Sequence, residues 1–447
     1  MDRTLLRRAH LLGLSVVLST QLVAEQAAAQ ASHGAPSEHA HAGVARLTFV
    51  EALELALERP EARGPSRVRA ARAVADGDVH RLAGNPSVQV QVGRRRVPRA
   101  DVGPEVQATI VQGFPLGRLG AARLAALASE LRALDVEQRV ERMWAALEGG
   151  DAWLALHAAE QRLEVAHACV ALGEQHLAVV SRAQVLRLAT DVDVSEATGA
   201  LGALRLEVTQ ADDERRAASL ALLHATAQHD QGLHAATLGA PPDVAVPPVD
   251  ELLGDPARFA GFPTLALHEA LVAAEVARAR EVERATRGVG ALGVYVERDS
   301  PRGIVLAGVF QATFGFVDRN GRGRAEAAER VARAEVQAVR AQHEAHGMFQ
   351  AAIDAVELTE RARLTHAAEV ITALEARAQQ LARRLALGAG TRAEVLRADL
   401  ALAQGRITQG RLDEAAARAR LRLRLLLDAA GSEDASAERF VAGTEAP

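Results

Sequence analysis

The sequence contains a single cysteine, Cys169, and no lysine, so that all 52 of its basic residues are arginine. One cysteine excludes an intramolecular disulfide and a zinc finger. Aromatic residues make up only 3% of the chain, which is unusual for an ordinary compact core. The 57 acidic residues leave a formal net charge of −5 with the two signs interspersed. This balance gives no electrostatic case for nucleic-acid binding.

The first 31 residues have the order of a secretory signal peptide. Three arginines precede an apolar run over 11–23, and Ala29-Gln30-Ala31 follows as a small-x-small cleavage site. The run is too short for a membrane-spanning helix, which needs about 20 residues. No later apolar stretch is long enough either. We expect an exported protein that is periplasmic, secreted, or held in an outer membrane by strands.

The chain repeats itself at an interval of about two hundred residues. The helical pattern over 163–180 recurs over 364–381 at a constant offset of 201, and Gly113-Phe114 recurs as Gly315-Phe316 at an offset of 202. A shared register in separate segments indicates a tandem duplication. We predict a first repeat over 46–240 and a second over 264–431, which a proline-rich linker over 241–263 joins.

Each repeat is expected to contain a long helix, a turn and a shorter return helix. Apolar residues spaced alternately by three and four are typical of a left-handed coiled coil. Thr391 and Glu394 have the spacing of a capping box. Helices of this composition are also compatible with a purely structural coiled coil. The predicted long helices span 118–188 and 323–388, and the return helices span 192–229 and 392–428.

Upstream of each long helix the apolar period changes from helical to two. This alternation predicts one β-hairpin over 86–116 and another over 289–317. The strands have the length that a tilted transmembrane strand requires, about 9–11 residues. Four strands cannot close a barrel, and open edges cannot face lipid. Either several chains pool their strands, or the hairpins belong to a water-soluble protein.

The order of these elements, with several local motifs, resembles the TolC-like outer-membrane efflux proteins. The resemblance covers roughly 47–431. The motifs that carry it are Leu47-Thr48-x-x-Glu51-Ala52-Leu53, Asn85-Pro86, Gln112-Gly113-Phe114-Pro115-Leu116, Asp318-Arg319-Asn320-Gly321-Arg322-Gly323-Arg324, and Leu387-Gly388-x-Gly390-Thr391 with Val395-Leu396-x-x-Asp399.

The resemblance implies a mainly α fold with a small β part. In this fold a duplicated unit of helix, β-hairpin and long helical hairpin builds a coiled-coil α-barrel, and four strands per chain contribute to a trimeric 12-stranded β-barrel. It implies an outer-membrane homotrimer with a periplasmic tunnel and no cofactor. Such a channel passively conducts solutes from an inner-membrane pump, of the RND type, and a periplasmic adaptor to the exterior. The chain shows no phosphate loop, nucleophile elbow or His-Glu-x-x-His helix, so an enzyme is not expected. The alternative is a periplasmic coiled-coil adaptor or structural protein without channel activity.

The turns between long and return helices would then form the periplasmic tip, where carboxylates can surround the axis and favour cations. Asp399 matches an acidic residue of the family tip, and Arg392 and Arg397 are candidates for salt bridges that hold the tip shut. The same acids could instead stabilise helix N-termini. The neighbouring acids that could contribute are Asp191, Asp193, Glu196 and Glu394.

The segment 32–45, which follows the predicted cleavage site, contains His33, His39 and His41. Flexible histidine-rich segments bind transition metals weakly. Together with a length similar to that of the heavy-metal branch of the family, these histidines suggest metal cations as the exported solutes. The alternative is a linker with incidental histidines. The residues 432–447 are expected to form a disordered tail.

Overall fold

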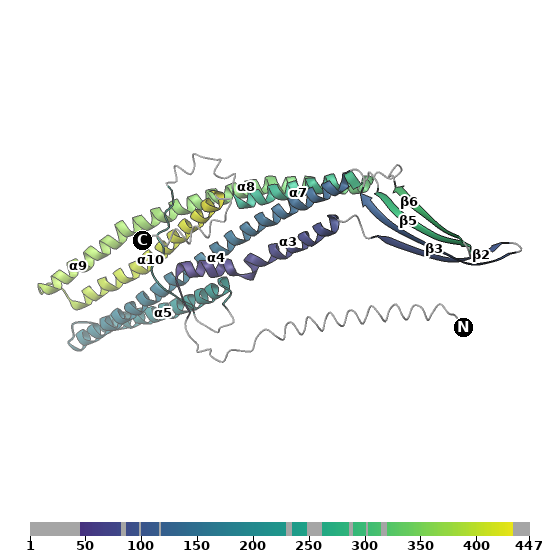
Figure 1. Ribbon diagram of the computed structural model, residues 1–447. Helices are drawn as coiled ribbons and strands as arrows, with labels where there is room; N and C mark the ends of the chain where they lie inside the picture. Colours follow the sequence, from purple (N-terminus) through teal and green to yellow (C-terminus); the bar gives the residue numbers. More distant parts are fainter. Residues whose placement is uncertain are drawn as a thin grey trace, which may run out of the picture.

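A computed structural model describes residues 45–81, 86–97, 100–115, 118–228, 235–247, 262–285, 289–300, 303–313 and 320–431. The predicted signal peptide, the three N-terminal histidines, most of the proline-rich linker and the predicted C-terminal tail lie outside these residues. The described part is elongated, with the long strands at one end and the two helical turns at the other (Figure 1).

Both halves of the chain run through a similar series of elements, except that two described helices precede the first hairpin and one precedes the second. Two short strands, β1 (Ala45–Leu47) and β4 (Ala235–Thr237), pair in parallel beside them. The first half contains α2 (Phe49–Glu58), α3 (Pro60–Arg81), β2 (Ser87–Val97), β3 (Ala100–Pro115), α4 (Leu119–Val185) and α5 (Asp191–Ala225). The second half contains α7 (Pro263–Ala285), β5 (Val289–Ser300), β6 (Gly303–Thr313), α8 (Gly321–Thr365), η3 (His366–Ile371), α9 (Thr372–Ala386) and α10 (Arg392–Gly431).

The long helices differ between the halves in one respect. α4 is a regular α-helix of 67 residues, about 100 Å at 1.5 Å per residue. Its counterpart was expected to be regular over 323–388, but a six-residue π-helix, η3, separates α8 from α9. The Thr372 hydroxyl donates to the Ala367 carbonyl at 3.1 Å, a local interaction that accompanies the wider turn. Single π-turns inside α-helices often mark functional sites.

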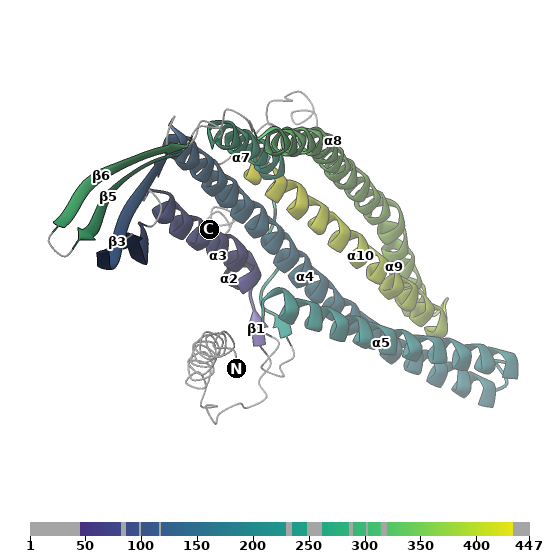
Figure 2. The same ribbon diagram turned by 90° about the vertical axis from the view of Figure 1, so that its right-hand side faces the viewer.

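The helices form a curved layer one helix thick (Figures 1 and 2). Beside the strands, the main contacts give the order α3, α4, α7, α8; towards the turns, they give the order α5, α4, α10 and then α8 with α9. Small side chains let neighbouring helices approach closely. Ala126 and Ala133 of α4 are buried, as are Ala327 and Ala334 of α8, 201 residues further along.

The largest core lies near the middle of the molecule, where α2 packs on α4. Thr48 begins α2 with a capping box, because its hydroxyl accepts from the Glu51 N–H at 3.2 Å while the Glu51 carboxylate accepts from the Thr48 N–H at 2.7 Å. A β-carbon on Gly149 would lie 2.6 Å from that of Ala56, so only glycine permits this close crossing. Trp153 is fully buried and donates to the Leu47 carbonyl at 2.8 Å, which ties β1 to α4.

The four long strands form one antiparallel sheet in the order β2-β3-β5-β6. The hairpin of each half pairs with the other through its inner strands, β3 and β5. β2 and β6 are the two edges. The strands are 11, 16, 12 and 11 residues long, in chain order. A tilted strand needs about 9–11 residues to cross a bilayer, so each is long enough.

Candidate functional site

The register of the sheet separates an apolar face from a polar face. Ile110 of β3 lies opposite Val88 of β2 and Val294 of β5, and its face continues along all four strands with aliphatic and aromatic side chains. These side chains are exposed, at 53% for Ile110 and 67% for Phe310. An exposed apolar surface of this size marks a contact with lipid or with protein. The exposed apolar residues of this face are Val88, Val90, Val92, Val106, Ile110, Leu292, Val294, Val296, Ile304, Leu306 and Phe310.

The opposite face carries small and polar side chains in cross-strand rows. One row contains Gln91, Gln107, Glu297 and Val305, and the next row towards the helices contains Gln89, Thr109, Tyr295 and Ala307. On the three strands β3, β5 and β6, most of these side chains are half-buried although nothing covers them in the described chain, as expected on the concave side of a curved sheet. The polar face is therefore the inner face of the curve.

At the other end of the molecule, both helical hairpins turn in the same way. In the first turn Arg187 has φ 57°, and the N–H groups of Arg187 and Leu188 donate to the Gln184 and Ala183 carbonyls, each at 2.8 Å. In the second turn Gly388 has φ 71°, and the corresponding bonds run from Gly388 to Leu385 and from Ala389 to Arg384. Both are Schellman motifs, and the equivalent residues lie 201 positions apart.

Each return helix then begins with a capping box. The Thr190 N–H and hydroxyl donate to the Asp193 carboxylate, each at 2.7 Å, and the Thr190 hydroxyl accepts from the Asp193 N–H. In the second hairpin the Thr391 N–H donates to Glu394 at 2.8 Å, and the Thr391 hydroxyl accepts from the Glu394 N–H at 3.3 Å. The predicted capping box at Thr391 is confirmed.

These caps lower the pKa values of both carboxyl groups. Hydrogen bonds from the Thr190 backbone and side chain hold the pKa of Asp193 below its usual value, and the charge of Arg397 adds to this effect. Bonds from Thr391 lower the pKa of Glu394 in the same way, with smaller contributions from Arg384 and Arg397. Two of the predicted tip acids are thus fixed negative charges that also stabilise helix N-termini.

Arg397 connects the two hairpins near their turns. Its Nε donates to His176 Nε2 at 3.1 Å, from α10 of the second half to α4 of the first. The imidazole accepts this bond only with Nε2 unprotonated. Partial burial and the charge of Arg397 both lower the pKa of His176, which favours that neutral form. His176 carries no local signal in the sequence, because its partner lies 221 positions away.

The other predicted tip residues lie on the same two return helices, α5 and α10. Asp191 accepts a hydrogen bond from Gln184 Nε2 at 2.6 Å, which joins the end of α4 to the start of α5. Glu196 is exposed in the second turn of α5, Arg392 is exposed at the start of α10, and Asp399 is half-buried on α10. All seven predicted residues therefore lie within the first eight residues of the return helices.

The turns also expose large apolar side chains. Leu188 is 80% exposed and Leu387 is 83% exposed at the ends of the two long helices. Burying such side chains is favourable, so their exposure in one chain indicates a surface for a partner. The exposed apolar residues of this tip surface are Val185, Leu186, Leu188, Val192 and Leu387.

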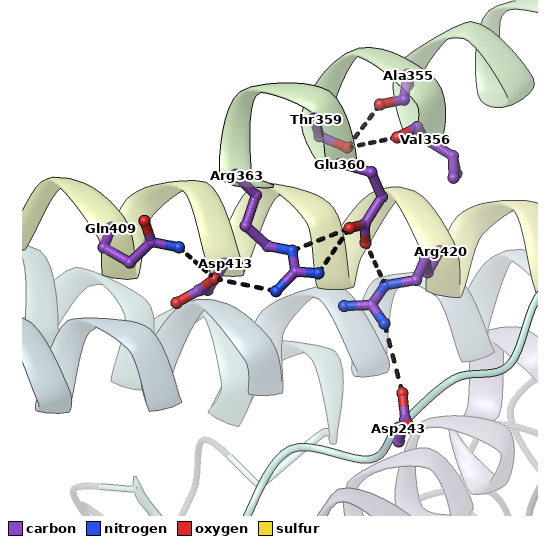
Figure 3. Close-up of polar contacts among 9 residues, drawn as sticks. All are labelled: Asp243, Ala355, Val356, Thr359, Glu360, Arg363, Gln409, Asp413 and Arg420. Carbon is purple, nitrogen blue, oxygen red and sulfur yellow. Dashed lines mark hydrogen bonds and ion pairs between the residues drawn. The ribbon is translucent and has the colours of Figure 1, made fainter. Parts of the chain in front are cut away.

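A chain of polar contacts runs between α8 and α10 above the tip (Figure 3). Glu360 accepts from Arg363 at 2.9 Å and pairs with Arg420 at 3.1 Å, and Arg420 also reaches Asp243 at 3.4 Å. Asp413 accepts from Gln409 at 3.0 Å, and Gln409 contacts His366 of η3 at 2.9 Å. The Arg420–Asp243 pair ties the second hairpin to the segment 241–247. Beyond η3, towards the turn, Arg406 of α10 pairs with Glu375 of α9 at 3.2 Å.

Two further properties concern the described residues only. Within them, no three histidine, cysteine or carboxylate side chains come together as a metal site. None of the described helices combines the length and the apolar character that a membrane-crossing helix requires.

The chain matches known proteins in a comparison of structures, but not in the comparisons of sequence. No protein-family model matches the chain, and no curated protein matches it significantly. A membrane protein from Pseudomonas aeruginosa matches with a TM-score of 0.69 at 16% identity, over 87% of this chain and 92% of that one. A structure of CusC, whose description mentions transmembrane channel formation, matches with a TM-score of 0.68 at 15% identity. The match covers 89% of this chain and 95% of that one. The CmeC outer membrane channel of Campylobacter jejuni matches with a TM-score of 0.69 at 10% identity, over 92% of this chain and 94% of that one.

These likenesses establish the fold. The chain has the fold of the outer-membrane channels along nearly its whole described length, as the resemblance in sequence predicted.

Proposed function

We propose that this chain is the outer-membrane channel of a tripartite efflux system, in which it passively conducts solutes out of the cell. The observation that carries the proposal is the two-faced sheet. Its outer face is apolar and exposed and its inner face is polar, on strands long enough to cross a bilayer. The same chain extends the sheet into helices of about 100 Å, which suits a tunnel through the periplasm.

The open edges support assembly with further copies. β2 and β6 each have one unpaired side, and open strand edges cannot face lipid. The helical layer ends on the same two sides, at α3 and α5 and at α8 and α9. These outer helices expose apolar side chains, such as Val68 at 71% and Val336 at 69%. Head-to-tail association of such edges gives a closed ring when the rotation from one copy to the next closes. With three copies, as in the family that the sequence resembles, twelve strands complete one barrel in the outer membrane.

The tip would be the regulated end of this tunnel. Asp193 and Glu394 are held ionised there, and Asp399 lies nearby on α10. Repeated around a ring, these carboxylates would favour cations. The bond between Arg397 and His176 would hold the two hairpins of each copy together. The π-helix η3 interrupts the long helix of the second hairpin and has no counterpart in α4, so the second hairpin is the one we expect to move when the tip opens.

Partners and cargo complete the proposal. The exposed apolar tip surface would receive a periplasmic adaptor, and an inner-membrane pump of the RND type would supply the energy. We propose metal cations as the cargo. The proposal rests on the acidic tip and on the histidines at 33, 39 and 41, which lie outside the described residues. Growth of a deletion strain on metals, dyes and antibiotics tests the cargo separately.

The direct test is current through purified protein in planar bilayers. The wild type should form stable channels, and multivalent cations added to the side of the tip should block them. Asp399→Ala should raise the half-blocking concentration several-fold, since a charge pair at 4 Å contributes about 1 kcal/mol in water. Glu344→Ala, which removes an acid paired with Arg340 on α8, should leave block unchanged.

Each other outcome removes part of the proposal. Unchanged block in Asp399→Ala would exclude Asp399 from the gate. A soluble monomer that forms no channels would reject the conduit and favour a periplasmic coiled-coil protein.

A further inference from the structure

The inner face of the sheet carries a carboxylate that is not part of the acidic tip. Glu297 of β5 lies three residues before the end of its strand, far from the helices. The register places it in a row with Gln91, Gln107 and Val305, so it is the one charged side chain of that row. The next row towards the helices contains Gln89, Thr109 and Ala307 around Tyr295, and it contains no carboxylate.

Contacts hold the Glu297 carboxylate at this face. The Tyr295 hydroxyl, two residues away on the same face, donates a hydrogen bond to Glu297 Oε2. Both side chains are half-buried, whereas Val294 and Val296 on the other face are exposed. The hydrogen bond from the Tyr295 phenol limits the rotamers of the Glu297 side chain. Glu297 is thus an acidic side chain held at the inner face of the curve.

We infer that Glu297 forms a second cation-selecting ring, near the outer mouth of the barrel and separate from the acids of the tip. The inference rests on the proposed function, because it needs several copies of the sheet closed around one lumen. Each copy then contributes one carboxylate and two glutamine amides at the same height. This set of oxygen ligands and dipoles suits hydrated cations and disfavours anions.

The lumen of a twelve-stranded barrel is wide, so the range of this charge decides its effect. Screening by salt limits the distance over which a charge acts to about 30 Å at 0.01 M salt and about 3 Å at 1 M. The ring should therefore select strongly at low salt and hardly at all at high salt. A contribution that disappears in 1 M salt would also distinguish the ring from selection by size.

The test is the reversal potential of reconstituted channels across a KCl gradient at low salt. Glu297→Gln, a change of nearly constant shape, should lower the ratio of K⁺ to Cl⁻ permeability by about twofold or more. Gln107→Glu adds a carboxylate to the same row and should raise that ratio. The gain variant keeps the inference testable even if the loss variant assembles poorly.

The outcomes separate this inference from the proposed function. Channels whose selectivity changes in neither variant would overturn the ring at Glu297 and leave the conduit intact. A wild-type protein that forms no channels would overturn both. Selectivity that changes in Glu297→Gln while the block at the tip is unaltered would support two independent rings.

Discussion

Ile110→Arg should prevent assembled protein from accumulating in the outer membrane, whereas Thr109→Arg should be tolerated. Ile110 is the eleventh of the sixteen residues of β3, on the exposed apolar face between Val88 and Val294. Arginine on the lipid face near the bilayer midplane costs about 2–4 kcal/mol. A symmetric trimer would incur this cost three times, so we expect little or no trimer from Ile110→Arg.

Thr109→Arg is the matched control, because the same side chain is introduced one residue away on the opposite face. Thr109 lies between Gln89 and Tyr295 on the polar face, where an arginine would reach water in the lumen. Membrane fractionation followed by semi-native electrophoresis measures both variants. Normal assembly of Ile110→Arg with loss of Thr109→Arg would mean that the two faces are assigned the wrong way round.

The second large effect concerns the seam between long and return helices. A β-carbon on Gly173 of α4 would lie 2.8 Å from Leu204 Cδ1 of α5, and one on Gly405 of α10 would lie 2.8 Å from Leu374 Cδ1 of α9. The equivalent positions, 201 residues apart, thus hold the same pair with glycine and leucine exchanged. In each hairpin one leucine fills the space beside the glycine of the facing helix. The leucine comes from the return helix in the first hairpin and from the long helix in the second.

Exchanging one pair should therefore be tolerated only as a double change. Gly173→Leu should destabilise the hairpin by about 1–3 kcal/mol through overpacking. Leu204→Gly should cost about 3–5 kcal/mol through the lost contacts and the cavity. The double variant recreates the arrangement of the second hairpin, and it should recover at least about 2 kcal/mol relative to the sum of the two changes.

Chemical unfolding followed by circular dichroism measures this cycle. Gly202→Leu is the control, because Gly202 is exposed on α5 with open space around its would-be β-carbon. It should not destabilise, and the helix propensity of leucine favours a small gain. A double variant no more stable than Leu204→Gly alone would show that the two hairpins pack differently around these positions.

The sequence predicted those features that depend on local chemistry or on periodicity. The alternation of apolar and polar residues on either side of Ile110 predicted strands, because every second residue of a strand lies on the same face and meets the same surroundings. The spacing of Thr391 and Glu394 predicted a cap, because both partners lie within one helical turn. The offset of 201 also recurs in structural details that were not predicted, such as the matched turns at Arg187 and Gly388.

Other features could not be predicted, because they depend on contacts between distant segments. The bond between His176 and Arg397 exists only once the two hairpins lie side by side. The π-helix η3 has no counterpart in α4, although 165–170 and 366–371 occupy equivalent positions. In the sequence Glu297 is an ordinary polar residue of an alternating strand, and only the register between strands shows that it is the one charged side chain of its row.

The central claim is that copies of this sheet join edge to edge around one lumen. Val90 of β2 and Leu306 of β6 lie in the same row at opposite edges, three strand spacings or about 14 Å apart within one chain. Cysteines at these distances cannot form a disulfide within a chain. The native Cys169 is buried and should contribute little background.

The decisive measurement is disulfide formation in membranes between Val90→Cys and each of four single changes on β6, namely Ile304→Cys, Leu306→Cys, Gly308→Cys and Phe310→Cys. Closed assembly predicts that at least one combination gives a covalent trimer and nothing larger. Chains that stay monomeric in every combination, or that link into ladders beyond three, would contradict a closed ring of three sheets.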